Sequence, residues 1–198
     1  MAVIIVDQLT KYIVHQTMTE DITVIPIFGD FFKLQYVTNP GMAFGVKIGG
    51  EYGKIILTVF RIIAITGIAY YITKIFKQKM HKAYQICLAF IFGGAVGNLL
   101  DSIFYAVLDP KLLVTTTDAS GNIVYPPTPW FHGKVIDMFF VDIIRGRTPA
   151  DWPIFGSTYY SLWPIFNVAD AAIFCSVIYI VFNQKKFFPT EETLINKE

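Results

Sequence analysis

Three long apolar runs place the strongest constraint on what this sequence can fold into. They cover residues 55–76, 84–107 and 162–182, and each has the roughly 20 residues that a helix needs to cross a bilayer. Apolar residues make up 54% of the 198-residue chain and charged residues only 16%, against about 25% charged residues in a soluble domain. The sequence therefore predicts an integral membrane protein, and it disfavours an ordinary soluble enzyme or a disordered chain.

Residues 2–18 form a fourth, shorter apolar segment. It carries Asp7, Lys11 and His15 at helical spacing, which places a polar stripe on one face. The segment lacks the basic start and the small-residue cleavage site of a signal peptide. We predict a short first span whose polar stripe faces other helices; the alternative is a helix that lies in the membrane interface. The expected fold is therefore mainly α, with four transmembrane helices.

The basic residues indicate which ends of the spans are cytoplasmic. They cluster between the second and third spans and again after the fourth, at Lys77, Lys79, His81, Lys82, Lys185 and Lys186. By the positive-inside rule these segments and both termini are cytoplasmic. The outer regions are then residues 19–54 and 108–161. We expect residues 1–198 to form a single membrane domain.

The outer regions are long enough to hold structure of their own. Residues 31–37 alternate in polarity and are rich in aromatic side chains, which predicts a strand. The tripeptide Asn39-Pro40-Gly41 predicts a turn after this strand. The second outer region is rich in turn-forming residues. We expect a small extracytoplasmic β-rich cradle and an extended outer loop.

Two carboxylates lie within the predicted spans, where a charge at the bilayer centre costs about 2.5–3.5 kcal/mol. Asp101 and Asp170 both fall toward the outer leaflet when the spans are oriented as above. An asparagine precedes each by three positions, at Asn98 and Asn167, and this spacing places each pair on one helical face. Because an amide can donate hydrogen bonds to a carboxylate, we expect the asparagines to hold these aspartates.

A third carboxylate, Asp137, lies in the apolar run 134–140 of the second outer region. It either reaches the membrane surface opposite Asp170 or is a solvated loop residue beside Lys134. Two carboxylates about 3 Å apart share one proton, so one can activate water while the other protonates a carbonyl oxygen. Such a pair would hydrolyse a peptide bond without a metal or a covalent intermediate.

Other chemistries find little support in the sequence. The three histidines lack the spacing of metal ligands, no HExxH, GxSxG or P-loop pattern is present, and the net charge of +1 gives no field for nucleic acid. We expect no metal or cofactor and no nucleic-acid partner. Two other functions stay open at this point: a transporter or proton channel that uses Asp101 and Asp170 as a proton path, and a structural scaffold.

Five short segments, taken together, resemble one known family. They are DQLTK at 7–11, NPGMAF at 39–44, GGAVGNLLD at 93–101, VID at 135–137 and FNVAD at 166–170. Their order and their places on the predicted spans and loops are similar to signal peptidase II, the family of bacterial lipoprotein signal peptidases. The resemblance implies a four-span aspartic endopeptidase of the bacterial inner membrane that cleaves diacylglyceryl-modified prolipoproteins just before the lipidated cysteine. It also implies contact with membrane lipid, an active site toward the outer leaflet and a monomer.

The resemblance also assigns roles to residues. The catalytic pair is Asp137 and Asp170, which leaves a supporting role for Asp101. The residues that support the site or bind substrate are Asp7, Lys11, Asn39, Gly41, Gly97, Asn98, Asp101, Val135, Asn167 and Ala169. For Asp7 and Lys11, an ion pair that joins helices is an equal alternative to contact with substrate.

The sequence departs from the family pattern at three places. Ser102 stands where the family usually has arginine, and Arg145 and Arg147 are the candidates to replace it. Residues 108–131 and 142–160 are insertions that extend the outer region, either as passive loops or as segments that cover the site or bind a partner. The first span is shortened at its start. None of these departures affects the catalytic pair.

Overall fold

The apolar runs at 55–76 and 84–107 form two long helices. α2 spans Gly53–Lys77, and α3 spans Lys82–Leu100 before it continues through a π-helical turn at Asp101–Tyr105 and the short α4 at Ala106–Leu108. Both are long and apolar enough to cross a membrane. The most apolar window of α2 is only 6% buried, which is the behaviour of a helix whose apolar surface meets lipid instead of a protein core.

The structure is a computed structural model that describes residues 1–41, 52–78, 80–118, 120–142, 145–147, 159–161 and 165–188. The chain divides into two compact units. The first comprises Met1–Gln8, Pro40–Val135 and Val168–Glu198, and the second comprises Leu9–Asn39 and Ile136–Asn167. The first unit is mainly helical, whereas the second contains the larger sheet.

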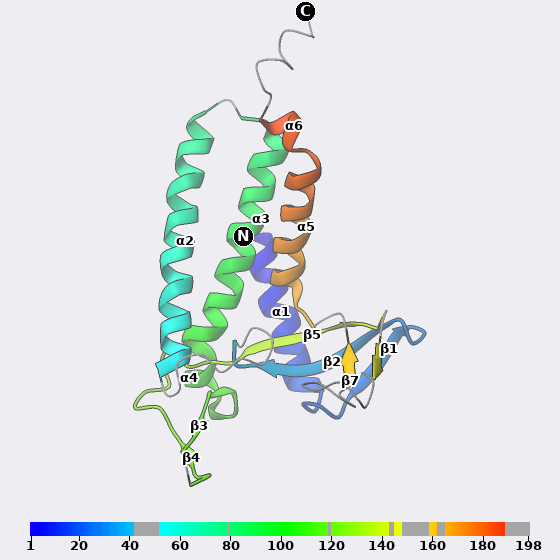
Figure 1. Ribbon diagram of the computed structural model, residues 1–198, viewed down its shortest axis with the longest axis vertical. Helices are drawn as coiled ribbons and strands as arrows, with labels where there is room; N and C mark the ends of the chain where they lie inside the picture. Colours follow the sequence, from blue (N-terminus) through cyan, green and yellow to red (C-terminus); the bar gives the residue numbers. More distant parts are fainter. Residues whose placement is uncertain are drawn as a thin grey trace, which may run out of the picture. The chain divides into compact units, whose positions relative to one another are not determined.

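In the first unit α3 contacts both α2 and α5, which spans Val168–Phe182 (Figure 1). A glycine allows α3 and α5 to approach closely, since a Cβ added to Gly94 would lie 2.4 Å from the carbonyl oxygen of Ala169. α1 spans Ala2–Thr17 and confirms the helix predicted at 2–18. These contacts set the positions of the polar side chains described below.

Gly94→Ala is expected to destabilise the protein, because the added methyl group meets a backbone atom of α5 that cannot move aside. We expect a loss of about 1–3 kcal/mol, as is typical of overpacking, measured as a lower Tm in detergent. Gly67→Ala on α2 is the matched control, since nothing lies within 4 Å of its added Cβ, and alanine favours a helix over glycine by about 1 kcal/mol. Equal Tm values for the two variants would contradict the close helix contact.

The start of α5 differs from the prediction. The sequence predicts a fourth span from residue 162, but α5 begins at Val168. Just ahead of it, the backbone of Phe166 pairs with that of Phe139, and each N–H donates to the other carbonyl, at 3.0 and 2.8 Å. This strand-like pairing excludes a helical turn there. Asn167 therefore precedes the helix, and the prediction that it shares a helical face with the aspartate three positions on is wrong.

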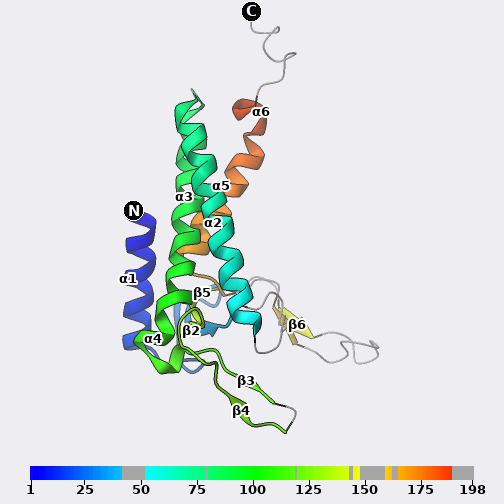
Figure 2. The same cartoon turned by 90° about the vertical axis from the view of Figure 1, so that its left-hand side faces the viewer.

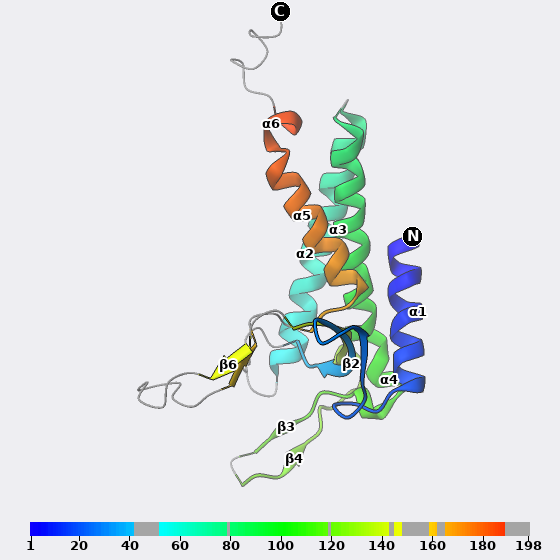
Figure 3. The same ribbon diagram turned by 90° about the vertical axis from the view of Figure 1, so that its right-hand side faces the viewer.

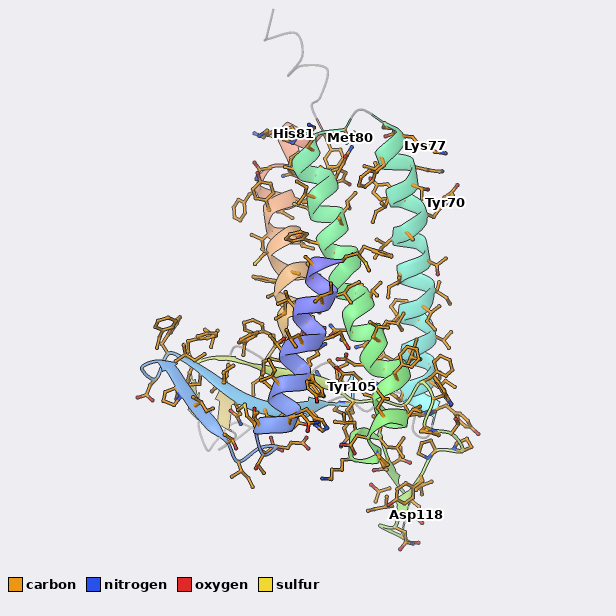
Figure 4. All side chains as sticks on the ribbon, turned by 180° about the vertical axis from the view of Figure 1, so that it is seen from behind. Tyr70, Lys77, Met80, His81, Tyr105 and Asp118 are labelled. Atoms are coloured by element: carbon orange, nitrogen blue, oxygen red, sulfur yellow. The ribbon has the colours of Figure 1, made fainter. Side chains whose placement is uncertain are left out.

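A buried cluster that includes aromatic side chains lies at the end of the first unit where α2 is followed by α3. The short helix α6, Gln184–Phe187, contributes to it. The buried cluster consists of Ile75, Tyr84, Leu88 and Phe187. Figure 4 shows Lys77, Met80 and His81 at this end of the helices. The basic residues that indicate the cytoplasmic side therefore lie beside this cluster.

The second unit carries a three-stranded sheet in the order β1–β2–β5. Its strands are β1 at Val24–Phe28, β2 at Phe32–Asn39 and β5 at Val135–Val141. β1 and β2 pair antiparallel, with Ile25 opposite Leu34, and β2 confirms the strand predicted at 31–37. A separate antiparallel pair is formed by β6, Arg145–Arg147, and β7, Tyr159–Ser161 (Figure 3).

The insertion at 108–131 contains a hairpin that belongs to the first unit. β3 at Thr116–Thr117 and β4 at Ile123–Val124 pair antiparallel (Figure 2), and Asp118 lies at the tip (Figure 4). The Asp118 carboxylate accepts hydrogen bonds from the backbone and side-chain N–H groups of Asn122, at 2.9 and 3.1 Å. This part of the insertion is therefore an ordered turn.

These hydrogen bonds lower the pKa of Asp118, and the bond from the Asn122 side chain is the largest cause. Because the pKa is lowered, the ionised carboxylate stabilises the hairpin fully at pH values above the ordinary titration range of aspartate. This contribution is lost as the pH falls through the lowered pKa. We expect Asn122→Ala to move the Asp118 titration, followed by NMR, back toward its ordinary range. An unchanged titration in this variant would contradict the hydrogen bonding at the tip.

Candidate active site

Asp170 lies in the first turn of α5, in the first unit. The side-chain amide of Asn98, on α3, donates a hydrogen bond to Asp170 Oδ1 at 2.7 Å. The first turn of a helix also favours a carboxylate, because its backbone N–H groups leave partial positive charge there. Both effects hold Asp170 in place relative to α3.

The start of α5 is capped by a side chain from another helix. The N–H of Ala169 donates to Asp7 Oδ1, on α1, at 2.9 Å, and both residues are fully buried. The N–H groups of a first helical turn have no partner within their own helix, so this carboxylate satisfies one of them. Gly97 makes room for it, since an added Cβ would lie 2.7 Å from Asp7 Oδ2.

Gln8 connects two buried carboxylates of the first unit. Its Nε2 donates to Asp7 Oδ2 at 3.1 Å and to Asp101 Oδ1 at 2.8 Å, and it lies 3.2 Å from the carbonyl oxygen of Gly97. The hydroxyl of Tyr105 donates to Gln8 Oε1 at 3.1 Å, which fixes the orientation of the amide. Asp101 therefore belongs to a network that joins α1 to α3.

Asp137, in the second unit, lies on β5 and is only 3% exposed. The alternative of a solvated loop residue is therefore wrong. Asn39 Nδ2, at the end of β2, donates to Asp137 Oδ2 at 3.1 Å. Asn167 Nδ2 donates to Asp137 Oδ1 at 2.7 Å. Each oxygen of this carboxylate thus accepts a hydrogen bond from an asparagine.

The asparagines bind aspartates that the sequence does not predict as their partners. The spacing predicts that Asn98 holds Asp101, but its amide donates to Asp170, on a different helix. The spacing also predicts that Asn167 holds Asp170, but its amide donates to Asp137. The reason is that α3 turns Asn98 toward α5, whereas Asn167 stands before α5 and beside strand β5.

The remaining predicted residues are found in both units. Gly41, just after β2, has a φ of +91°, a conformation that favours glycine. A Cβ added there would lie 2.6 Å from Leu57 Cδ2, so α2 also passes close to this turn. Lys11 on α1 and Val135 at the start of β5 are buried. The family segment at 42–44 lies outside the described residues.

Arg61, on α2, was not predicted as a site residue. Its Nη1 donates to Ser102 Oγ at 2.7 Å, so it brings a guanidinium to Ser102, where we expect a replacement arginine. The side chains of Arg145 and Arg147, the predicted replacements, lie outside the described part of the chain. A signal was present in the sequence, since Lys54 and Arg61 stand at i and i+7 on one face of the largely apolar first half of this helix.

Comparisons with known proteins show the family to which the chain is similar. A family model described as Signal peptidase (SPase) II matches residues 1–185. The chain is 39% identical over 186 residues to the lipoprotein signal peptidase of Amoebophilus asiaticus, covering 92% of this chain and 74% of the relative. It is 33% identical over 186 residues to that of Porphyromonas gingivalis, covering 90% and 77%.

A solved structure gives the same result for the fold. It is a bacterial membrane enzyme determined by the in meso method, and it superposes with a TM-score of 0.57 at 25% identity. The superposition covers 95% of this chain and 89% of that chain. Together with the family model and the relatives, this shows that the chain belongs to the signal peptidase II family, a family of membrane peptidases.

Proposed function

We propose that this protein removes the signal peptides of diacylglyceryl-modified prolipoproteins by cleaving before the lipidated cysteine. The names of its relatives support the class of substrate, since they are lipoprotein signal peptidases. The observation that supports an aspartic mechanism is that Asp137 and Asp170 each accept a hydrogen bond from the side-chain amide of an asparagine. We therefore assign these two as the catalytic pair, in place of the transporter and scaffold alternatives.

In the proposed reaction one carboxylate of the pair is ionised and the other is protonated. The ionised carboxylate takes a proton from water as the water oxygen bonds to the scissile carbonyl carbon, and the protonated one donates its proton to the carbonyl oxygen. The carbon–nitrogen bond then breaks as one carboxylate takes a hydroxyl proton from the intermediate and the other protonates the leaving nitrogen. The products are a carboxylic acid and an amine, and the pair again holds one proton.

The asparagine amides suit this chemistry because their N–H groups donate to a carboxylate without entering the proton transfer. They orient the two aspartates while leaving the protons to the pair and the substrate. Asp7 supports Asp170 in turn, because it caps the helical turn that carries this residue. The other supporting residues in this proposal are Lys11, Asn39, Gly41, Gly97, Asn98, Asp101, Val135, Asn167 and Ala169.

We further propose a single four-span domain in the bacterial inner membrane, formed by α1, α2, α3 with its continuation, and α5. The lengths and compositions of α2 and α3 support it. Lys77 at the end of α2 and Lys185 and Lys186 on α6 support cytoplasmic termini. The site then lies toward the outer leaflet, where the acyl chains of the substrate stay in the bilayer. The protein acts as a monomer in contact with lipid, without metal, cofactor or nucleic acid.

The test of this function is cleavage of a synthetic diacylglyceryl lipobox peptide by the purified protein in detergent, followed by mass spectrometry. We expect a product that begins with the lipidated cysteine, and no effect of a metal chelator. The same peptide without the diacylglyceryl group is the control and should stay intact. A folded protein that cleaves neither peptide would contradict the proposed function, and equal cleavage of both would contradict the requirement for lipid.

A further inference from the structure

Helix α2 contacts its neighbours through polar side chains near its start, in addition to Ile75 in the buried cluster near its end. Its apolar side chains are largely exposed, yet Lys54, Thr58 and Arg61 lie on one face, at i, i+4 and i+7. Lys54 and Thr58 are buried, and the Thr58 hydroxyl donates to the carbonyl oxygen of Phe131 at 3.0 Å. This polar face therefore anchors an otherwise exposed helix to the rest of the first unit.

Three hydrogen bonds connect this face to the start of α5. Arg61 Nη1 donates to Ser102 Oγ at 2.7 Å. The Ser102 hydroxyl donates to the backbone carbonyl of Asn98 at 3.1 Å. The side-chain amide of Asn98 donates to Asp170 Oδ1 at 2.7 Å. All four residues belong to the first unit, so the connection runs from α2 through α3 to α5 within one unit.

The guanidinium of Arg61 determines how the hydroxyl of Ser102 is oriented. The Ser102 side chain is fully buried at the start of the π-helical turn. Because its oxygen accepts a hydrogen bond from Arg61, its own proton is directed toward the Asn98 carbonyl. A hydrogen bond from a charged donor is roughly twice as strong as a neutral one. Arg61 thereby holds Asn98 through the backbone, while the side chain of Asn98 holds the catalytic carboxylate.

We propose that Arg61 is a positioning residue for the reaction: it acts on Asp170 through Ser102 and Asn98. The proposal rests on the proposed function. Supporting groups must hold a catalytic side chain within about 0.5 Å of its productive geometry, and a misplacement of about 1 Å can lower a rate on the order of 100-fold. Since Arg61 acts on the catalytic carboxylate and not on the bound peptide, its loss lowers kcat and leaves KM unchanged.

The first test is Arg61→Leu in the lipobox-peptide assay, which is expected to lower kcat by about 10- to 100-fold while KM stays within about twofold. Arg61→Lys keeps the charge but loses the planar fork of donors, so its kcat should fall between those of the leucine variant and the wild type. Lys74→Leu is the matched control on the same helix. It also removes one positive charge, from an ammonium that lies over the ring of Tyr70, and should leave kcat unchanged.

The second test moves the guanidinium to the other side of its hydrogen bond. In the double variant Arg61→Ser with Ser102→Arg, the charged group extends from α3 and the hydroxyl from α2. We expect this exchange to recover most of the kcat that Arg61→Leu loses. Ser102→Arg alone brings two guanidinium groups together in a buried place, and is expected to be slower than the double variant. If Arg61→Leu lowered kcat only because a long side chain was removed from α2, the exchange would not restore kcat.

Several outcomes would overturn the proposal. They are a folded Arg61→Leu protein with the kcat of the wild type, a variant in which only KM rises, and a double variant as slow as Arg61→Leu. If the Arg61→Leu variant does not fold, the kcat values of Arg61→Lys and of the double variant test the proposal instead. If the wild type cleaves nothing, the proposed function fails, and the connection is tested by a thermal-unfolding cycle of Arg61→Leu and Asn98→Ala. Strictly additive changes in stability in that cycle would overturn it.

Discussion

Asp137→Asn and Asp170→Asn are each expected to abolish detectable cleavage of the lipobox peptide. An amide keeps the size of the carboxyl group, and its oxygen still accepts a hydrogen bond from the neighbouring asparagine. It neither takes a proton from water nor gives one to a carbonyl oxygen. A general acid or base contributes about 10²–10⁴-fold. Because the reaction needs both members of the pair, we expect losses at the upper end of this range.

Turnover and Tm are to be measured on the same preparations, so that loss of activity is separated from loss of fold. Asp118→Asn is the matched control, because its carboxylate is exposed at the tip of the hairpin and its loss should leave turnover unchanged. Detectable turnover by purified Asp137→Asn or Asp170→Asn would refute the pair. An active Asp137→Asn together with an inactive, folded Asp101→Asn would show that the roles of these aspartates are the reverse of those proposed.

Asp7→Ala is expected to lower both Tm and kcat. It leaves the buried N–H of Ala169 without its acceptor and removes one of the carboxylates that Gln8 binds. A buried donor without a partner costs about 1–3 kcal/mol, which thermal unfolding in detergent will detect. The capped turn carries Asp170, so loss of the cap also shifts a proposed catalytic group, and kcat is expected to fall on the order of 100-fold.

Two further variants test whether loss of the cap causes the expected decreases in Tm and kcat. Asp7→Asn keeps an oxygen that can accept from Ala169, so it should recover most of the loss in Tm. Asp30→Ala removes a carboxylate that is exposed and lies 3.3 Å from Lys33 Nζ, and it should change neither quantity, because exposed ion pairs contribute little. Wild-type stability of Asp7→Ala would contradict the assignment of this carboxylate as the cap of α5.

The elements that could be predicted from the sequence depend on local patterns. α2 and α3 occupy long, largely apolar runs, and β2 follows the alternation at 31–37. The π-helical turn was not predictable in this way, because its apolar pattern fits either kind of helix. It is fixed by tertiary contact: the Ser102 carbonyl accepts from the N–H of Gly133, and a Cβ on that glycine would lie 2.1 Å from the carbonyl oxygen of Asp101.

The sequence indicated the candidate residues of the site more readily than it indicated their hydrogen-bond partners. The cost of a carboxylate in a membrane drew attention to Asp101 and Asp170, and the apolar run 134–140 drew attention to Asp137. The family resemblance then assigned Asp137 and Asp170 as the catalytic pair. The partners of the asparagines were out of reach, because Asn98 and Asp170 are separated by 72 positions and meet only after α3 packs on α5. No spacing rule within a single helix describes such a contact.

The cap on α5 determines the order in which the protein can become active. Asp7 is synthesised 162 positions before the N–H group that it binds. Until α5 is inserted, an unfinished chain holds this charge in a partly assembled bundle, which is costly in a bilayer. A chain that ends before α5 is therefore expected to be inactive and less stable. On this view the peptidase acts on its substrates only after translation has delivered α5.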